Sequence, residues 1–103
     1  MTDQRVMPAG LELVRTTPEF SNETVPRALL AAHTVAADVW GRLCVRAGSV
    51  HFAFEADARR VDLAAGDHVD IPPGEPHHLE PGIDARFVVE FYRAPPADRS
   101  PLA

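Results

Sequence analysis

Histidines are the residues of this sequence best suited to chemistry, and there are five of them. A neutral imidazole can bind a metal ion or move a proton near pH 7. Because successive side chains of a strand point to opposite faces, alternation divides the histidines into two kinds. His51 lies between apolar neighbours, and His68 alternates with Val69 and Ile71. Both are therefore expected to face solvent.

The other three histidines include candidates for the interior. His33 is in register with Leu29 and Val35 on an apolar face. His77 and His78 are adjacent, so only one of them can point inward from a strand. Two inward histidines from separate strands could share a metal ion through neutral ring nitrogens. A buried histidine that only makes a hydrogen bond in the core is the alternative.

The segment before His77 carries a spaced motif, G-x5-P-x-G-x2-H, formed by Gly66, Pro72, Gly74 and His77. Glycines and prolines favour a tight turn between strands, and the histidine follows directly after it. This pattern resembles the second conserved motif of the cupin superfamily, whose histidine is a metal ligand. The first cupin motif is incomplete here, because its second histidine is missing. His33 could stand for its first histidine and Gly48 for its closing glycine.

A narrower group, the TehB/YeaR-like cupins, resembles most of the chain, from residue 11 to residue 93. The similar runs are 15–20, 33–34, 40–43, 45–48, 72–80 and 89–92. In that family the domain stands alone or precedes a methyltransferase linked to tellurite resistance. No glycine-rich methyltransferase loop occurs in this sequence. The resemblance implies an all-β fold, a small single-domain cupin β-barrel (a jelly roll or double-stranded β-helix).

The resemblance also implies a metal site. His33 and His77 are the predicted ligands, with Glu80 as the first candidate carboxylate and Glu90 as the second. Strict alternation puts Glu80 on the opposite face from His77, so a bulge or a place at the barrel mouth is needed. A solvated strand-end carboxylate is the alternative for Glu80. The predicted cofactor is a divalent metal, zinc first, with iron, nickel or manganese as alternatives.

The elements that must position these residues are short strands separated by turns, at 11–15, 42–46, 50–55, 59–63, 68–71, 77–80 and 85–93. A hairpin is predicted at Gly48, between the second and third of them. Segment 27–35 is predicted as a further strand, although its Ala-Leu-Leu-Ala-Ala run favours a helix by propensity. A helical turn is predicted at 18–20. Residues 1–10 and 94–103 are predicted to be flexible ends around a domain at 11–93.

Composition limits the classes of function. A chain of 103 residues with 46% hydrophobic residues is typical of one globular domain. The net charge of −5 and a pI of about 5.4 argue against a nucleic-acid partner. The longest apolar run, 28–32, is too short to cross a membrane. With one cysteine and no signal-peptide pattern, a cytoplasmic location is predicted, and a homodimer is expected because the domain is small.

Three functions remain open from the sequence. The first is a metal-binding or small-molecule-binding protein related to stress, as in tellurite resistance, without catalysis. The alternative is a metal-dependent enzyme, such as an oxygenase or isomerase, that uses two histidines and one carboxylate. The third is a metal-free interaction or sensor domain.

Overall fold

The structure is a computed structural model that describes residues 5–30 and 34–95. Its strands are β1 (Glu12–Thr16), β2 (Phe20–Ser21), β3 (Trp40–Ala47), β4 (Ser49–Phe54), β5 (Arg60–Ala64), β6 (His68–Ile71), β7 (His77–Pro81) and β8 (Arg86–Arg93). One short 3-10 helix, η1 (Arg27–Leu30), lies between β2 and β3. The predicted all-β fold is confirmed. None of the described helices has the length and apolar composition needed to cross a membrane.

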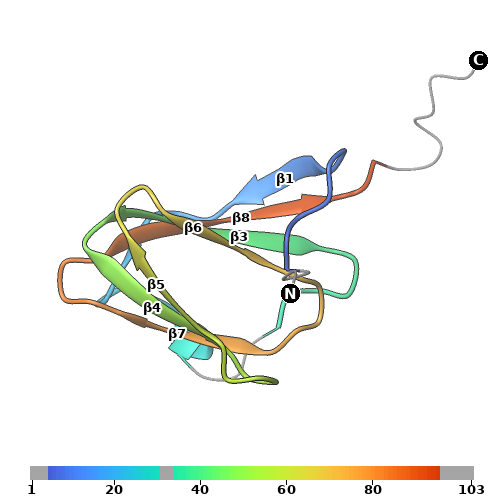
Figure 1. The fold of residues 1–103 in the computed structure, drawn as a ribbon. Helices are drawn as coiled ribbons and strands as arrows, with labels where there is room; N and C mark the ends of the chain where they lie inside the picture. The colour runs from blue at the N-terminus through green and yellow to red at the C-terminus, as the bar shows by residue number, and fades with distance from the viewer. Residues whose placement is uncertain (1–4, 31–33, 96–103) are drawn as a thin grey trace, which may run out of the picture.

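The strands form two antiparallel sheets that face each other (Figure 1). One sheet has the order β1-β8-β3-β6, with β2 also paired to β8, and the other has the order β5-β4-β7. Within the described residues, pairing joins strands inside each sheet and does not join the two sheets. The result is a small barrel that is open between its sheets, and this architecture is the predicted cupin barrel.

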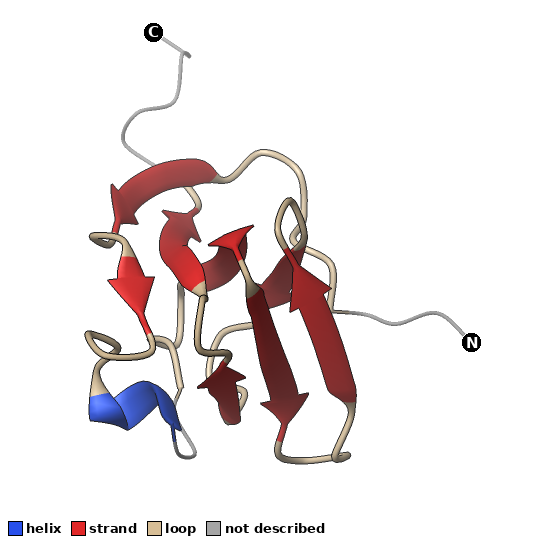
Figure 2. Ribbon diagram, turned by 90° about the vertical axis from the view of Figure 1, so that its left-hand side faces the viewer, coloured by secondary structure: helices blue, strands red, loops and turns tan. Residues whose placement is uncertain are grey.

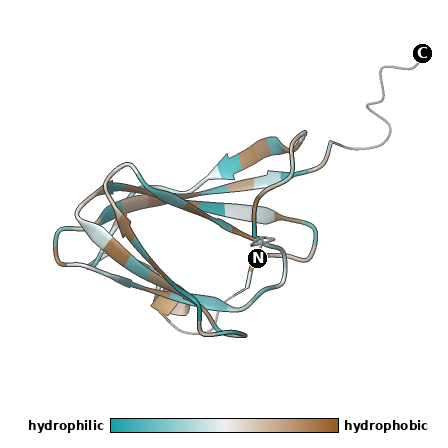
Figure 3. Cartoon of the chain, viewed as in Figure 1, coloured by the Kyte–Doolittle hydropathy of each residue, from teal (hydrophilic) through white to brown (hydrophobic). Residues whose placement is uncertain are grey.

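The core lies between the two sheets because alternate side chains of each strand point inward. In β3, Leu43 and Val45 are almost completely buried, and in β4 the same holds for Val50, Phe52 and Phe54. Figure 3 shows the resulting alternation of hydrophobic and hydrophilic residues along the strands. Burial of one such side chain contributes about 1.5–3 kcal/mol, so the core is the main source of stability.

The predicted hairpin at Gly48 is wrong, although the two predicted strands exist. β3 pairs with β6 and β8, whereas β4 pairs with β5 and β7. At Gly48 the chain crosses from one sheet to the other. Its φ is +65°, and a Cβ there would lie 2.6 Å from the carbonyl carbon of Asp84. A turn residue signals a change of direction, but it does not determine which strands pair.

The region between β2 and β3 also differs from the prediction. Segment 27–35 was predicted as a strand, but residues 27–30 form η1, the helix in Figure 2. The amide of Leu29 donates to the carbonyl of Pro26 at 3.0 Å, so helix propensity decided the local structure there. Upstream, Phe20 pairs with Phe87 in β2 instead of forming the predicted helical turn.

Residues 5–10, at the start of the described chain, contact the barrel. The amide of Met7 donates to Oδ2 of Asp70 at 3.0 Å. The carboxylate of Asp70 also accepts hydrogen bonds from Arg42, the shorter at 2.7 Å from Nε. Asp70 is 8% exposed. The amide of Met7 therefore attaches this segment to a nearly buried carboxylate that is also paired with Arg42.

Candidate functional site

His77 is a buried imidazole on the inner wall of the barrel. It is the first residue of β7, follows the loop 72–76, and is 2% exposed. Its Nδ1 lies 3.0 Å from the carbonyl oxygen of Glu75. Because a carbonyl only accepts, Nδ1 must donate, and in a neutral ring Nε2 then carries the lone pair. The imidazole also stacks on Phe52, with ring centroids 5.2 Å apart and an interplanar angle of 19°.

The ring of His77 forms part of the wall of a cavity of about 190 Å³ between the sheets. Most of the other lining residues are apolar: Phe20, Pro26, Ala28, Leu29, Val35, Leu43, Phe52, Ile71, Leu79, Val89 and Phe91. Ligand sites in proteins commonly combine an apolar wall with a few polar groups that orient the ligand. An apolar cavity of roughly 150 Å³ in another protein binds benzene. The volume here therefore suits a small organic molecule.

Among the described residues, the polar side chains on this wall besides His77 are those of Arg15 and Thr17. The hydroxyl of Thr17 donates to the carbonyl of Pro18 at 2.9 Å and accepts from the amide of Val89 at 3.0 Å. Thr17 is therefore used by the fold. Arg15 lies opposite Phe91 in the β1–β8 register, with its guanidinium carbon 5.6 Å from the centre of that ring. In the part of the wall that the structure describes, the imidazole of His77 and the guanidinium of Arg15 are therefore the groups to consider beside Thr17.

The predicted carboxylate ligands lie on outer faces of the barrel. Glu80 is exposed and pairs with His51 in a β4–β7 register that contains no bulge. Glu90 lies in β8 on the same face as Arg42 and accepts a hydrogen bond of 2.6 Å from the hydroxyl of Tyr92. Neither carboxylate lines the cavity that contains His77.

The predicted metal site stays a prediction. His33, its other histidine, lies outside the described residues. In residues 5–30 and 34–95, no group of three or more His, Cys, Asp or Glu side chains could hold a metal ion. The structure brings neither Glu80 nor Glu90 to His77.

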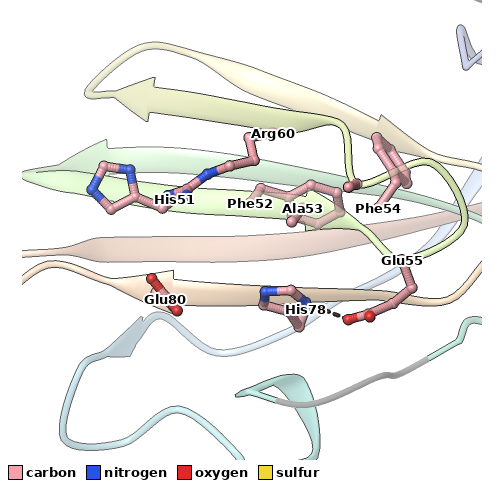
Figure 4. A pocket seen from close by; sticks show the side chains of 9 residues that line it. His51, Phe52, Ala53, Phe54, Glu55, Arg60, His78 and Glu80 are labelled. Carbon is pink, nitrogen blue, oxygen red and sulfur yellow. Dashed lines mark hydrogen bonds and ion pairs between the residues drawn. The ribbon is translucent and has the colours of Figure 1, made fainter.

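The outer face of the β5-β4-β7 sheet carries a second set of histidines (Figure 4). Nδ1 of His51 lies 2.7 Å from Oδ1 of Asp62, and Nδ1 of His78 is paired with the carboxylate of Glu55. The side chains of His51, Glu55, His78 and Glu80 line a hollow over the sheet. The side chain of His51 is 47% exposed, so the prediction that it faces solvent is confirmed. His68, on β6, is also exposed as predicted.

Arg5 supports the loop that precedes His77, and the sequence pattern gave no sign of it. Its Nε donates to the carboxylate of Glu75, and its Nη2 donates to Asp57 at 3.0 Å. The guanidinium carbon also lies 3.9 Å from the centre of the Phe54 ring. Arg5 thus ties together the β4–β5 turn and the loop whose backbone carbonyl orients His77. Seventy positions separate Arg5 from Glu75, so local patterning could not reveal the contact.

Cys44 lies on the outer side of β3 and is partly buried. Burial raises the pKa of the thiol above its usual value, and the charge of Glu90 acts in the same direction. A raised pKa lowers the fraction of thiolate, which is the reactive form.

Comparisons with known proteins agree with this architecture. No curated protein matches the chain. A protein of solved structure from E. coli strain K12 is 26% identical, with a TM-score of 0.82, over 88% of this chain and 98% of that one. TehB from Haemophilus influenzae is 19% identical, with a TM-score of 0.77, over 85% of this chain. The chain spans about a third of TehB, since the match covers 33% of that protein.

A family model gives the assignment directly. The model of the TehB-like domain matches residues 15–89, which run from the end of β1 to the middle of β8 and include most residues of the cavity wall. The matched part contains His77 and the glycine-proline turn before it. The chain therefore belongs to the TehB-like domain family.

Proposed function

We propose that this protein is a non-catalytic binding protein whose barrel cavity holds a small molecule beside His77. The observation that carries the proposal is the cavity itself: about 190 Å³, mostly apolar, with a buried imidazole on its wall. The carbonyl of Glu75 orients that imidazole through Nδ1, so the ring is held in place on the cavity wall. A fixed polar group in an apolar pocket is the usual means of orienting a ligand.

A divalent metal needs more donors than the described wall supplies. His77 is the one histidine of the described wall, and the predicted carboxylates Glu80 and Glu90 lie on outer faces. A metal at this place would therefore depend on His33 and on donors from the ligand or from water. The enzyme alternative, with two histidines and one carboxylate, also requires a carboxylate beside His77. For this reason we favour an organic ligand as the occupant. A role in oxyanion stress stays a prediction from the family.

Thermal unfolding in the presence of small molecules tests the proposal. A ligand that binds the folded state raises the unfolding temperature. Aromatic and branched aliphatic compounds of up to about ten non-hydrogen atoms are the matching panel. We expect at least one of them to stabilise the wild type. The control is Ala28→Trp, because Ala28 lines the cavity but is exposed on η1, so a large side chain can block the cavity without entering the core. Equal stabilisation of both proteins would place binding elsewhere.

Elemental analysis of untagged protein, purified without chelator, tests the predicted metal separately. Stoichiometric metal in the wild type and its loss in His77→Ala would establish a metal as part of the site. If the protein only binds its ligand, the same samples should neither convert an offered substrate nor consume dioxygen. Conversion of a substrate by the wild type that is lost in His77→Ala would overturn the proposal.

The homodimer expected from the sequence stays a proposal, and we propose that two copies pair through β1. β1 is an edge strand, and its Leu13 and Val14 are 52% and 51% exposed. An exposed edge strand is a place where a second copy could pair. Sedimentation equilibrium of the wild type and of Val14→Lys tests this surface.

A further inference from the structure

Arg15 is a cation on the wall of an otherwise mostly apolar cavity. It lies in β1 opposite Phe91 and lines the same cavity as His77. Its guanidinium carbon is 5.6 Å from the centre of the Phe91 ring. A guanidinium that packs its flat face on an aromatic ring keeps its N–H groups at the edge, where they can bind an anion.

The charge of Arg15 is not neutralised by a carboxylate in the described part of the chain. Arg42 and Arg5, by comparison, have ion pairs with Asp70 and Glu75. No such pair is formed by Arg15 in residues 5–30 and 34–95, where its guanidinium lies over the ring of Phe91. A cation beside an apolar cavity, with its charge still available, points to an anionic group on the molecule that enters.

We infer that the ligand of the cavity is a small carboxylic acid with an apolar body. The carboxylate binds the guanidinium of Arg15, and a planar guanidinium can hold both carboxylate oxygens at once. The body of the acid packs against Phe20, Leu29 and Phe91. This inference rests on the proposed function, because it names the ligand class of the same cavity.

The size of the cavity decides which probe is suitable. Roughly 150 Å³ is enough for benzene in an apolar cavity, and the cavity here is about 190 Å³. A benzene ring with one carboxylate is therefore the matching probe. Benzoate is the charged probe, and benzamide is its neutral counterpart of nearly equal shape.

The experiment is a calorimetric titration of both probes into the wild type, Arg15→Gln, Arg15→Lys and Ala28→Trp. Arg15 is exposed on an edge strand, so its substitution is not expected to unfold the protein. We expect benzoate to bind the wild type at least about ten-fold more tightly than benzamide, because its hydrogen bonds to Arg15 are charge-assisted. Arg15→Gln should remove this preference, and Arg15→Lys should keep part of it. Ala28→Trp should weaken both probes.

The outcomes separate this inference from the proposed function. If both probes bind equally, and Ala28→Trp weakens both, the acid is the wrong ligand class but the cavity is still a binding site. If benzoate keeps its preference in Arg15→Gln, another group binds the carboxylate and the role of Arg15 is overturned. If neither probe binds at millimolar concentration, the inference fails, and the proposed function fails with it only if the wider thermal-unfolding panel also shows no binding. If both probes bind but Ala28→Trp changes nothing, they bind outside the cavity and both the inference and the proposed function fail.

Discussion

His77 and His78 are neighbours in sequence and lie on opposite faces of β7. His77 is 2% exposed, stacks on Phe52 and donates to a backbone carbonyl. The side chain of His78 is 32% exposed and is paired with the carboxylate of Glu55. His77 is thus held in place on the cavity wall, whereas His78 is partly exposed and pairs with a carboxylate on the outer face. Proximity to carboxylates therefore does not mark the histidine that lines the cavity.

The largest expected effect that tests this contrast comes from His77→Ala. The substitution removes a buried ring and leaves a void beside Phe52, so we expect a loss of about 2–4 kcal/mol of stability. The matched control, His78→Ala, removes a partly exposed pair and should cost less than about 1 kcal/mol. Urea unfolding of both variants measures the difference. Equal losses would show that the two faces are not distinct in the way described.

The alternation that separates these histidines could be predicted from the sequence, and so could most strands. His68–Ile71 is a strand with the predicted bounds, and Glu80 lies on the face opposite His77, as alternation required. The period of two depends only on local backbone geometry, which a short segment already determines. The side on which a side chain lies is therefore the most predictable part of the site.

Pairing between strands and contacts between distant segments could not be predicted in this way. Gly48 marks a turn in the sequence, but whether the chain forms a hairpin or changes sheet depends on β6, β7 and β8, which come later. Likewise Arg5 reaches Glu75 across seventy positions. Arg15 joins the cavity wall next to an irregularity in the β1–β8 pairing, between residues 13 and 15. Each of these features arises from tertiary packing, and alternation carries no information about them.

A second prediction extends the comparison to two carboxylates on outer faces, Asp70 and Asp62. Asp70 is 8% exposed and bound by Arg42, whereas the Asp62 side chain is 72% exposed. We expect Asp70→Asn to cost about 1.5–3 kcal/mol at pH 7, because hydrogen bonds between charged groups are lost. Asp62→Asn, as the control, should cost less than about 1 kcal/mol.

The pH dependence of this loss has a defined sign. Burial alone would raise the pKa of Asp70, but hydrogen bonds from Arg42 and Met7 outweigh it and lower the pKa below its usual value. The contribution of Asp70 is therefore complete above its unfolded pKa of about 4 and declines as pH falls through the lower folded pKa. Unfolding free energies measured between pH 7 and pH 2 should show wild type and Asp70→Asn converging in acid. A constant difference would contradict the assignment.

A third prediction concerns the support of the inner histidine. Arg5→Ala removes the contact with Glu75 and the packing on Phe54, so we expect a loss of about 1 kcal/mol, near the upper end for a partly exposed pair. The control is Arg46→Ala. In the wild type, Nη1 of Arg46 lies 3.7 Å from Oε2 of Glu19, and the Arg46 side chain is 58% exposed. It should have almost no effect. Because Glu75 orients His77, Arg5→Ala should also broaden or shift the His77 ring signals in NMR spectra, and Arg46→Ala should not.

The smallest expected effect is the coupling between His51 and Asp62 on the outer face. Their atoms Nδ1 and Oδ1 are 2.7 Å apart, but the side chains are 47% and 72% exposed. Water and salt screen such a pair, and holding both side chains in one geometry costs entropy. A double-mutant cycle with His51→Ala and Asp62→Ala should therefore give a coupling of about 0.2–1 kcal/mol that falls with added salt. A coupling well above this range, or one insensitive to salt, would mean that the outer hollow is screened from solvent, and the functional distinction between the two faces would then have to be revised.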